Sequence, residues 1–375
     1  MLDFYLFPIS YAFYTFPIAA AIFTLPFLVV QYRRHGYIHK YRALILYLFL
    51  LYLMNAFYLI ILPFPDSVHN SPPKAESYAQ WIPFHFISDI VKETGARLDS
   101  PATYVRLLTE RAFLQVVFNV LLTVPFGMFM RHYLRTRWPA CLLCTLGLSL
   151  FFEITQVTAI FGIFDYPYRL FDVDDLMMNT AGGMIGFLFA DWLGRWLPRI
   201  DKLDERTDLS RRRVAYTQRA IAFLFDWAIL LPPFVLLSVA RVPYSYVLIV
   251  VAYFIVLPYL TNGLTPGKWL VRIRLKGRGE RITLGELTAR YGLLYLLAGG
   301  ANVAFVRAGL HSISPMVMLL FAFVLFVFDM AVAVHFLRCL FNRNRRLIHE
   351  EKSGTAHVIT AKSSTVKETR RKKHG

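Results

Sequence analysis

Long apolar stretches recur along this 375-residue chain, and each is close to the length that a helix needs to cross a membrane. About 20 apolar residues cross the hydrocarbon core of a bilayer. Hydrophobic residues make up 57% of the chain and charged residues only 17%, a balance that favours a polytopic membrane protein over a soluble one. We therefore predict an all-α membrane bundle of about nine transmembrane helices. The candidate spans lie at roughly 8–31, 41–62, 111–131, 138–160, 174–196, 215–239, 244–262, 288–310 and 313–339.

Basic residues gather in every second loop between these spans. The loop after the first span carries Arg33, Arg34, Lys40 and Arg42 without an acidic residue, and the segment after the last span is strongly basic. The positive-inside rule then places the N-terminus outside and the C-terminus inside. Because the net charge of +17 is explained by these topology signals, we expect membrane lipids as partners and no nucleic acid.

The charged segment 197–213 lacks an apolar stripe and predicts a domain boundary. We expect a five-helix membrane domain at 1–196 and a four-helix membrane domain at 214–358, followed by a basic disordered tail at 359–375. Alternating residues and turn glycines further predict a small cytoplasmic β-hairpin around 268–284.

The long loop 63–110, expected on the outer side, leaves two interpretations open. Its segment 84–98 fits a short amphipathic helix at the membrane interface, because Phe84, Ile87 and Val91 fall on one side. An ordinary tethered loop fits equally well.

Polar residues interrupt the apolar pattern most densely between residues 153 and 179. Each charge near hydrocarbon costs at least a few kcal/mol, so a cluster of such groups calls for an explanation. One explanation is mutual pairing that locks the helices together. The other, which we favour, is a ligand-binding pocket open to the outside. The candidate ligand-binding residues are Asn119, Glu153, Gln156, Arg169, Asp172, Asp174, Asp175 and Asn179.

These residues stand in segments that resemble the VanZ-like family over roughly residues 40–196. The segments are Asn119-Val-Leu-Leu-Thr-Val-Pro-Phe-Gly127, Glu153-x-x-Gln156 and Arg169-x-Phe-Asp172-Val-Asp174-Asp175-x-x-x-Asn179-Thr-x-Gly182. The resemblance implies a multi-pass protein of the bacterial cell membrane that is associated with teicoplanin-type glycopeptide resistance. A glycopeptide or a lipid-linked wall precursor would then be a partner.

The second half of the chain is similar to the RDD family over roughly residues 211–360. Arg219 and Asp226 match the first two family positions, whereas Glu350 stands where the family has its second aspartate. Asp226 and Asp329 both lie inside apolar spans. The ion-pathway candidates are Arg219, Asp226, Asp329 and Glu350, and pairing of the carboxylates with arginine is slightly favoured over ion carriage.

Three functions are therefore open. The first is an envelope-facing binding or resistance protein, the second is an ion- or proton-coupled transporter, and the third is a membrane enzyme acting on a lipid or wall precursor. An enzyme is the least favoured, because the outer cluster contains no nucleophile beside a base and no histidine. We predict no catalytic residues, no metal site and no cofactor, and we interpret Cys141-x-x-Cys144 as two small helix residues.

Overall fold

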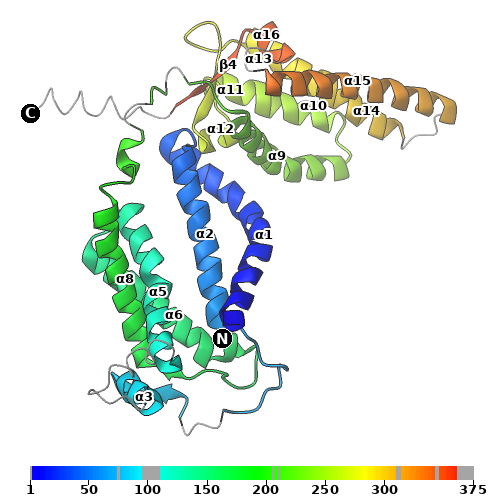
Figure 1. The fold of residues 1–375 in the computed structure, drawn as a ribbon. Helices are drawn as coiled ribbons and strands as arrows, with labels where there is room; N and C mark the ends of the chain where they lie inside the picture. The colour runs from blue at the N-terminus through cyan, green and yellow to red at the C-terminus, as the bar shows by residue number, and fades with distance from the viewer. Residues whose placement is uncertain are drawn as a thin grey trace, which may run out of the picture. The chain divides into compact units, whose positions relative to one another are not determined.

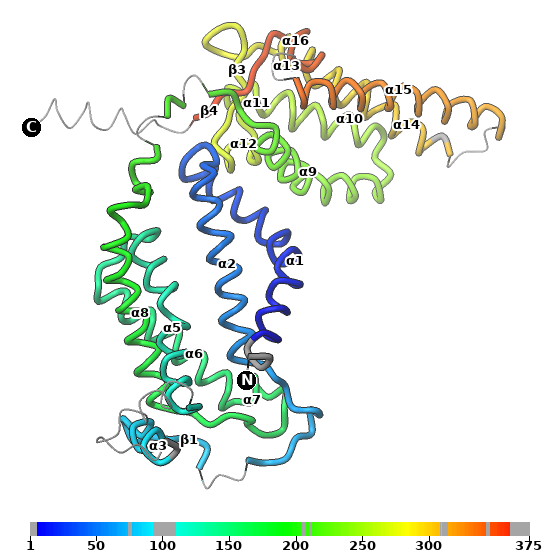
Figure 2. The backbone as a smooth tube through the Cα atoms, viewed as in Figure 1, coloured from blue at the N-terminus to red at the C-terminus, as the bar shows by residue number. Residues whose placement is uncertain are grey.

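The computed structural model describes residues 2–73, 77–94, 110–204, 207–209, 212–309, 314–342 and 346–360 (Figures 1 and 2). Helices dominate the described chain, and the only paired strands there are two short two-stranded sheets. The predicted all-α membrane bundle is confirmed.

Seven helical segments in the described chain are long and apolar enough to cross a membrane. Two expected spans are not among them. Helix α8 (Val173–Leu193) carries three aspartates and Asn179, and the segment Ser245–Leu260 is shorter. The seven segments are Leu6–His35 of α1 (Leu2–His35), α2 (Lys40–Ile61), α5 (Arg111–His132), α6 (Trp138–Val157), α9 (Tyr216–Val239), Leu284–Arg307 and α15 (Pro315–Phe341).

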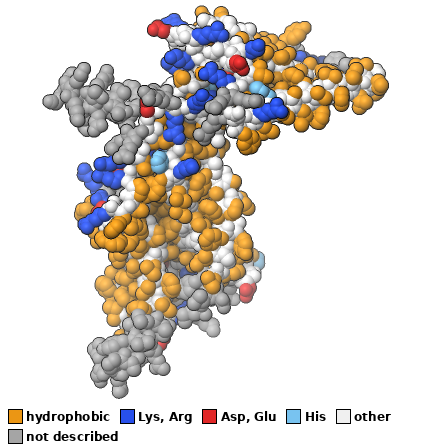
Figure 3. Space-filling view, turned by 45° about the horizontal axis from the view of Figure 1, so that its top comes forward, with side chains coloured by type: hydrophobic (Ala, Val, Ile, Leu, Met, Phe, Trp, Pro, Cys, Tyr) orange, Lys and Arg blue, Asp and Glu red, His pale blue; other side chains and the backbone are white. Residues whose placement is uncertain are grey.

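The long helices expose apolar side chains along their length. On α15, Leu319 is 70% exposed and Phe323 is 64% exposed, where a soluble protein would bury such residues. Figure 3 shows hydrophobic side chains over these helices, with Lys and Arg gathered in separate groups. Lipid tails are the environment that suits such a surface.

The chain divides into two compact units, each built around its own helices. The first unit comprises residues 1–23 and 39–203, and the second comprises residues 24–38 and 204–375. In the second unit, the end of α1 packs beside α9, where the Tyr32 hydroxyl lies 2.5 Å from the Thr217 hydroxyl.

In the first unit, α5, α6 and α8 pack on one another, and α2 packs against α5 and α6. Short elements connect them at the ends. They are β1 (Ala79–Gln80), α3 (His85–Thr94), α7 (Ala159–Gly162), β2 (Phe171–Asp172) and η1 (Ile200–Lys202). The parallel pairing of β1 with β2 joins the loop between α2 and α5 to the start of α8. Of the helix predicted at 84–98, α3 confirms the part from His85 to Thr94, and residues 95–98 lie outside the described chain.

Helices α5 and α8 approach so closely that only glycine fits between their backbones. A Cβ atom at Gly127 would lie 1.8 Å from the Gly183 carbonyl oxygen, and one at Gly186 would lie 2.0 Å from the Val124 carbonyl oxygen. Small residues allow this kind of packing in membrane helices, where no hydrophobic effect drives the helices together.

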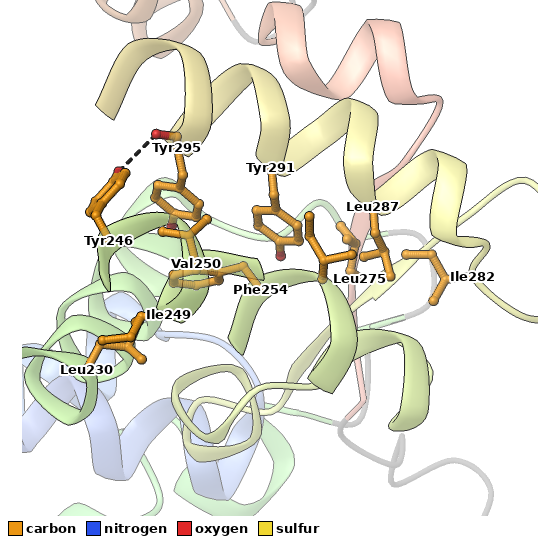
Figure 4. Close-up of a cluster of buried hydrophobic side chains, with 11 residues drawn as sticks. Leu230, Tyr246, Ile249, Val250, Phe254, Leu275, Ile282, Leu287, Tyr291 and Tyr295 are labelled. Atoms are coloured by element: carbon orange, nitrogen blue, oxygen red, sulfur yellow. Dashed lines mark hydrogen bonds between the residues drawn. The ribbon is translucent and has the colours of Figure 1, made fainter. Parts of the chain in front are cut away.

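The second unit has an aromatic core between α9, the 245–260 segment and the 284–307 segment. Figure 4 shows Tyr246, Phe254, Tyr291 and Tyr295 in this cluster, where the Tyr246 hydroxyl donates to the Tyr295 carbonyl at 2.9 Å. The elements of these segments are α10 (Ser245–Val250), η2 (Val251–Val256), α11 (Leu257–Leu260), α13 (Leu284–Tyr291), η3 (Gly292–Gly299) and α14 (Gly300–Ala308). The remaining elements are α12 (Pro266–Leu270), β3 (Ile273–Lys276), α16 (Ile348–Ser353) and β4 (Ala356–Ile359).

The β-hairpin predicted around 268–284 is wrong, because β3 does not pair with the residues that follow the turn. Strand β3 forms there, but it pairs antiparallel with β4, with Ile273 opposite Ile359. The residues after the turn start α13 instead, because Thr283 and Glu286 form a capping box. Ile359 therefore belongs to a strand, and the predicted tail from residue 361 onward lies outside the described chain.

We predict that Gly186→Ala destabilises the first unit by at least about 2 kcal/mol, because the added methyl group overlaps the α5 backbone. Gly147→Ala is the matched control, since nothing lies within 4 Å of a Cβ atom at that position. Unfolding of the detergent-solubilised protein measures both changes. Equal stability of the two variants would contradict the close packing.

Candidate functional site

A cavity of about 1410 Å³ lies within the first unit. Five of the eight predicted ligand-binding residues line it, and Glu153, Asp174 and Asn179 are not part of its lining. The five are Asn119, Gln156, Arg169, Asp172 and Asp175. The apolar part of the lining includes Tyr52, Leu59, Phe118, Leu121 and Leu122.

Asp174 is a structural anchor for α3. Its side chain is 3% exposed, and its two carboxylate oxygens accept the backbone N–H groups of Phe84 at 2.6 Å and Phe86 at 2.9 Å. A carboxylate at the start of a helix satisfies N–H groups that have no partner within the helix. Asp174 therefore ties α3, whose His85 and Asp89 line the cavity, to the start of α8.

Glu153 and Asp172 fix the entry into α8. The Glu153 carboxylate, 2% exposed, accepts the Asp172 N–H at 2.9 Å, and Asp172 Oδ1 accepts the Asp174 N–H at 2.8 Å as the helix N-cap. Burial raises the pKa of Asp172, and the hydrogen bond from the Asp174 N–H partly offsets that effect.

Asp175 faces α5 across the cavity wall. Its Oδ1 atom accepts a short hydrogen bond from the Asn119 amide, and the Gln115 amide lies 3.5 Å from the same oxygen. This contact joins α5 to α8 through an amide and a carboxylate.

Asn179 and Gln156 bind the neighbouring helices. The Asn179 amide, 1% exposed, donates to Ser149 Oγ at 3.1 Å, and the backbone carbonyl of Asn179 accepts from Thr123. The Gln156 amide donates to the Ile60 carbonyl at 3.0 Å and so holds α6 against the end of α2. These contacts agree with the interpretation in which mutual pairing of polar residues locks the helices together.

Arg169 lies in the loop before β2 and is half-buried. Its charge acts on Glu153 and Asp175, yet among the described residues no carboxylate comes within 4.0 Å of its guanidinium. The cavity lining therefore contains two guanidinium groups, Arg111 and Arg169, and three carboxylates, Asp89, Asp172 and Asp175. Arg169 forms no ion pair with any of these carboxylates.

The second unit contains a separate charged cluster around Glu350. Its Oε1 atom accepts from Arg219 at 2.9 Å and from Arg290 at 3.1 Å, and Arg290 also donates to Thr355 Oγ1 at 2.8 Å. Burial opposes ionisation of Glu350, but nearby His357 and the two guanidinium groups outweigh it and hold the pKa of Glu350 well below its usual range. Burial lowers the pKa of His357, whose neutral ring nitrogen lies 3.4 Å from Arg290 Nη2.

Asp226 is held by a second set of contacts. It accepts from the Tyr253 hydroxyl at 2.8 Å, the Thr265 hydroxyl at 2.7 Å and the Gly267 N–H at 2.8 Å, and Lys268 Nζ lies 3.8 Å away. The pairing interpretation is therefore favoured at Asp226, although its cation is a lysine and not one of the expected arginines. The other intramembrane carboxylate, Asp329, accepts from the Asn302 amide at 3.2 Å.

The comparisons with known proteins agree with this division into two units. The model of the VanZ/LLP1 family matches residues 49–194, and the model of the RDD family matches residues 213–349. The chain joins a VanZ-like region to an RDD-family region. No curated protein and no solved structure matched the chain. We call the two units the VanZ-like unit and the RDD unit. Together with the apolar helices, the two families make this an integral membrane protein.

Sequence reasoning missed several residues that complete these clusters. In the VanZ-like unit, Ser149 stands four residues before Glu153, and this helical spacing was the available signal. In the RDD unit, Lys268 is only 5% exposed and lies near Asp226. The signal there was Thr265-Pro266-Gly267, a helix start whose N–H groups suit a carboxylate. His357 had no such signal, because its position depends on the pairing of β4.

We predict that Asp174→Ala lowers the free energy of unfolding by about 3 kcal/mol, because two backbone N–H groups lose a buried charged acceptor. Asp191→Ala on the same helix is the control, since that carboxylate is 50% exposed and its ion pair with Arg131 contributes at most about 1 kcal/mol. Denaturant unfolding in detergent compares the two. A loss at Asp174 no larger than at Asp191 would contradict the anchoring role.

We predict that Glu350→Gln destabilises the RDD unit by about 3–5 kcal/mol at neutral pH, because it leaves Arg219 and Arg290 without their anion. The folded pKa of Glu350 lies below its ordinary value of 4.5, so its contribution is present above about pH 4.5 and is lost as the pH falls through the folded pKa. The unfolding curves of wild type and variant should therefore converge in acid. Exposed Glu351→Gln should change little, and a constant difference down to strongly acidic pH would be inconsistent with the assignment.

Proposed function

We propose that this protein is a bacterial cell-membrane protein whose VanZ-like unit binds an amphiphilic component of the cell envelope on the outer side. We further propose that this binding underlies resistance to teicoplanin-type glycopeptides. One observation carries the proposal. The 1410 Å³ cavity combines an apolar lining from α2 and α5 with the charged residues Arg169, Asp172 and Asp175.

The size and lining of the cavity support an amphiphile. Sites for drug-sized ligands occupy about 300–1,000 Å³, so this cavity has room for a larger molecule or for a headgroup with part of its chain. Tyr52, Leu59 and Leu122 suit an apolar chain, whereas the Asn119 amide and the charged residues suit a polar headgroup. A glycopeptide with an acyl chain and a lipid-linked wall precursor both combine an apolar chain with a polar group.

The orientation of the chain adds support for an envelope ligand. The positive-inside pattern of the sequence assigns the starts of α5 and α8 to the outer side. Asn119 and Asp175 are near those starts, so a ligand that approaches from outside would meet them first. Because Asp226 is already bound by other residues of the protein, this carboxylate gives less support to the alternative function of ion or proton transport.

We predict that Asp175→Asn and Glu153→Gln return the glycopeptide susceptibility of a producing strain to that of a strain without the gene. Asp175→Asn changes the charge of the cavity, and Glu153→Gln weakens the acceptor that holds the Asp172 N–H. Broth susceptibility to teicoplanin measures the effect. Asp191→Asn is the control, and membrane levels of each variant are compared by immunoblot. Full resistance in both site variants would refute the proposed function.

A further inference from the structure

We infer that the ligand headgroup in this cavity carries an organic ammonium group next to an anionic group. This inference rests on the proposed function and names the ligand class that the site would select. Four groups carry the argument: Asp172, Asp175, Gln156 and Arg169, all of which line the cavity.

The two aspartates each use one carboxylate oxygen and leave the other without a hydrogen bond from the described residues. Asp175 accepts both amides through Oδ1, and Asp172 accepts the Asp174 N–H through Oδ1. The Oδ2 atoms of both residues remain as acceptors in the cavity wall. Both residues line the same cavity, with Asp172 at the N-cap of α8 and Asp175 in its first turn, so their acceptors lie at the same end of this helix.

Gln156 gives independent support for a hydrogen-bond donor in the ligand. Its side chain is only 4% exposed, and its Nε2 atom already donates to the Ile60 carbonyl. Among the described residues nothing donates to its carbonyl oxygen. Because Gln156 lines the cavity, this oxygen is available to accept a hydrogen bond from a ligand N–H group.

Arg169 supplies the complementary charge. Within the part of the chain that the structure describes, its guanidinium has no carboxylate within 4.0 Å, so its donors remain for a ligand anion. A guanidinium binds phosphate or carboxylate through two parallel hydrogen bonds. Asp89, the third aspartate of the lining, is already paired with His85 at 3.0 Å. The arrangement therefore fits a zwitterion, with the ammonium at the two aspartates and the anion at Arg169.

An ammonium fits this site better than a metal ion. Hard cations such as Ca²⁺ take six to eight oxygen ligands, often with several carboxylates. Over the described ranges of the chain, no three His, Cys, Asp or Glu side chains converge in a way that could hold a metal. The shared chemistry, an amine beside a phosphate or carboxylate, occurs both in amino-phospholipids and in amine-bearing lipoglycopeptides.

Three lysolipids with the same acyl chain test the inference on the full-length protein in detergent. They are lysophosphatidylethanolamine, its N-acetyl derivative without the ammonium charge, and lysophosphatidylglycerol. Binding is measured by native mass spectrometry at pH 7. We expect lysophosphatidylethanolamine to bind at least ten-fold more tightly than the N-acetyl derivative. Asp175→Asn should remove this preference, Arg169→Gln should weaken all three phospholipids, and Asp191→Asn should change neither.

The outcomes separate this inference from the proposed function. Equal affinity for the amine and its N-acetyl derivative would overturn the ammonium assignment while leaving amphiphile binding intact. Binding of none of the three lipids, and of no lipoglycopeptide, would overturn both. Competition identifies the source of the ligand. Displacement of the bound lysolipid by an amine-bearing lipoglycopeptide, lost in Asp175→Asn, supports an antibiotic ligand. Preferred lysophosphatidylethanolamine binding without displacement supports a membrane lipid.

Discussion

The close approach of α8 to α5 is the contact on which the rest of the VanZ-like unit depends. Because Gly182 and Gly186 have no side chain, the backbone of α8 lies directly against the Val120 and Val124 carbonyls of α5. About two helical turns before Gly182, at the start of α8, this approach brings the Asp175 carboxylate to the Asn119 amide. Bulkier residues at the glycines would separate the helices and move the cavity wall with them.

The acidic residues of this unit divide into two groups with different roles. Asp174 and Glu153 are almost completely buried, and both accept backbone N–H groups that shape the start of α8 and of α3. Asp172 and Asp175 line the cavity and keep a carboxylate oxygen for other partners. A buried carboxylate in an apolar setting is tolerated when hydrogen bonds satisfy it, and these contacts provide them. The first group therefore positions the second.

In the RDD unit, by contrast, a buried carboxylate is paired with side chains of opposite charge. Glu350 lies between two guanidinium groups, and its longer side chain, where the family has aspartate, still brings Oε1 to within 3.1 Å of both. The same contact holds α16 near α13, while β4 pairs with β3. Charge pairing and strand pairing thus attach the end of the described chain to the helices of this unit.

The sequence by itself determined the fold class, the approximate spans and the two family regions, because apolar length and the spacing of polar residues along a helix are local properties. It also identified the segment from Asp172 to Asp175 as important. Only the tertiary structure decided that Asp174 binds the α3 backbone whereas its neighbour Asp175 faces the cavity. The pairing of β3 with β4, and of Asp226 with Lys268, was decided there too. Such partners lie far apart in the chain, and helix packing, which no local pattern encodes, determines which of several equivalent polar groups meet.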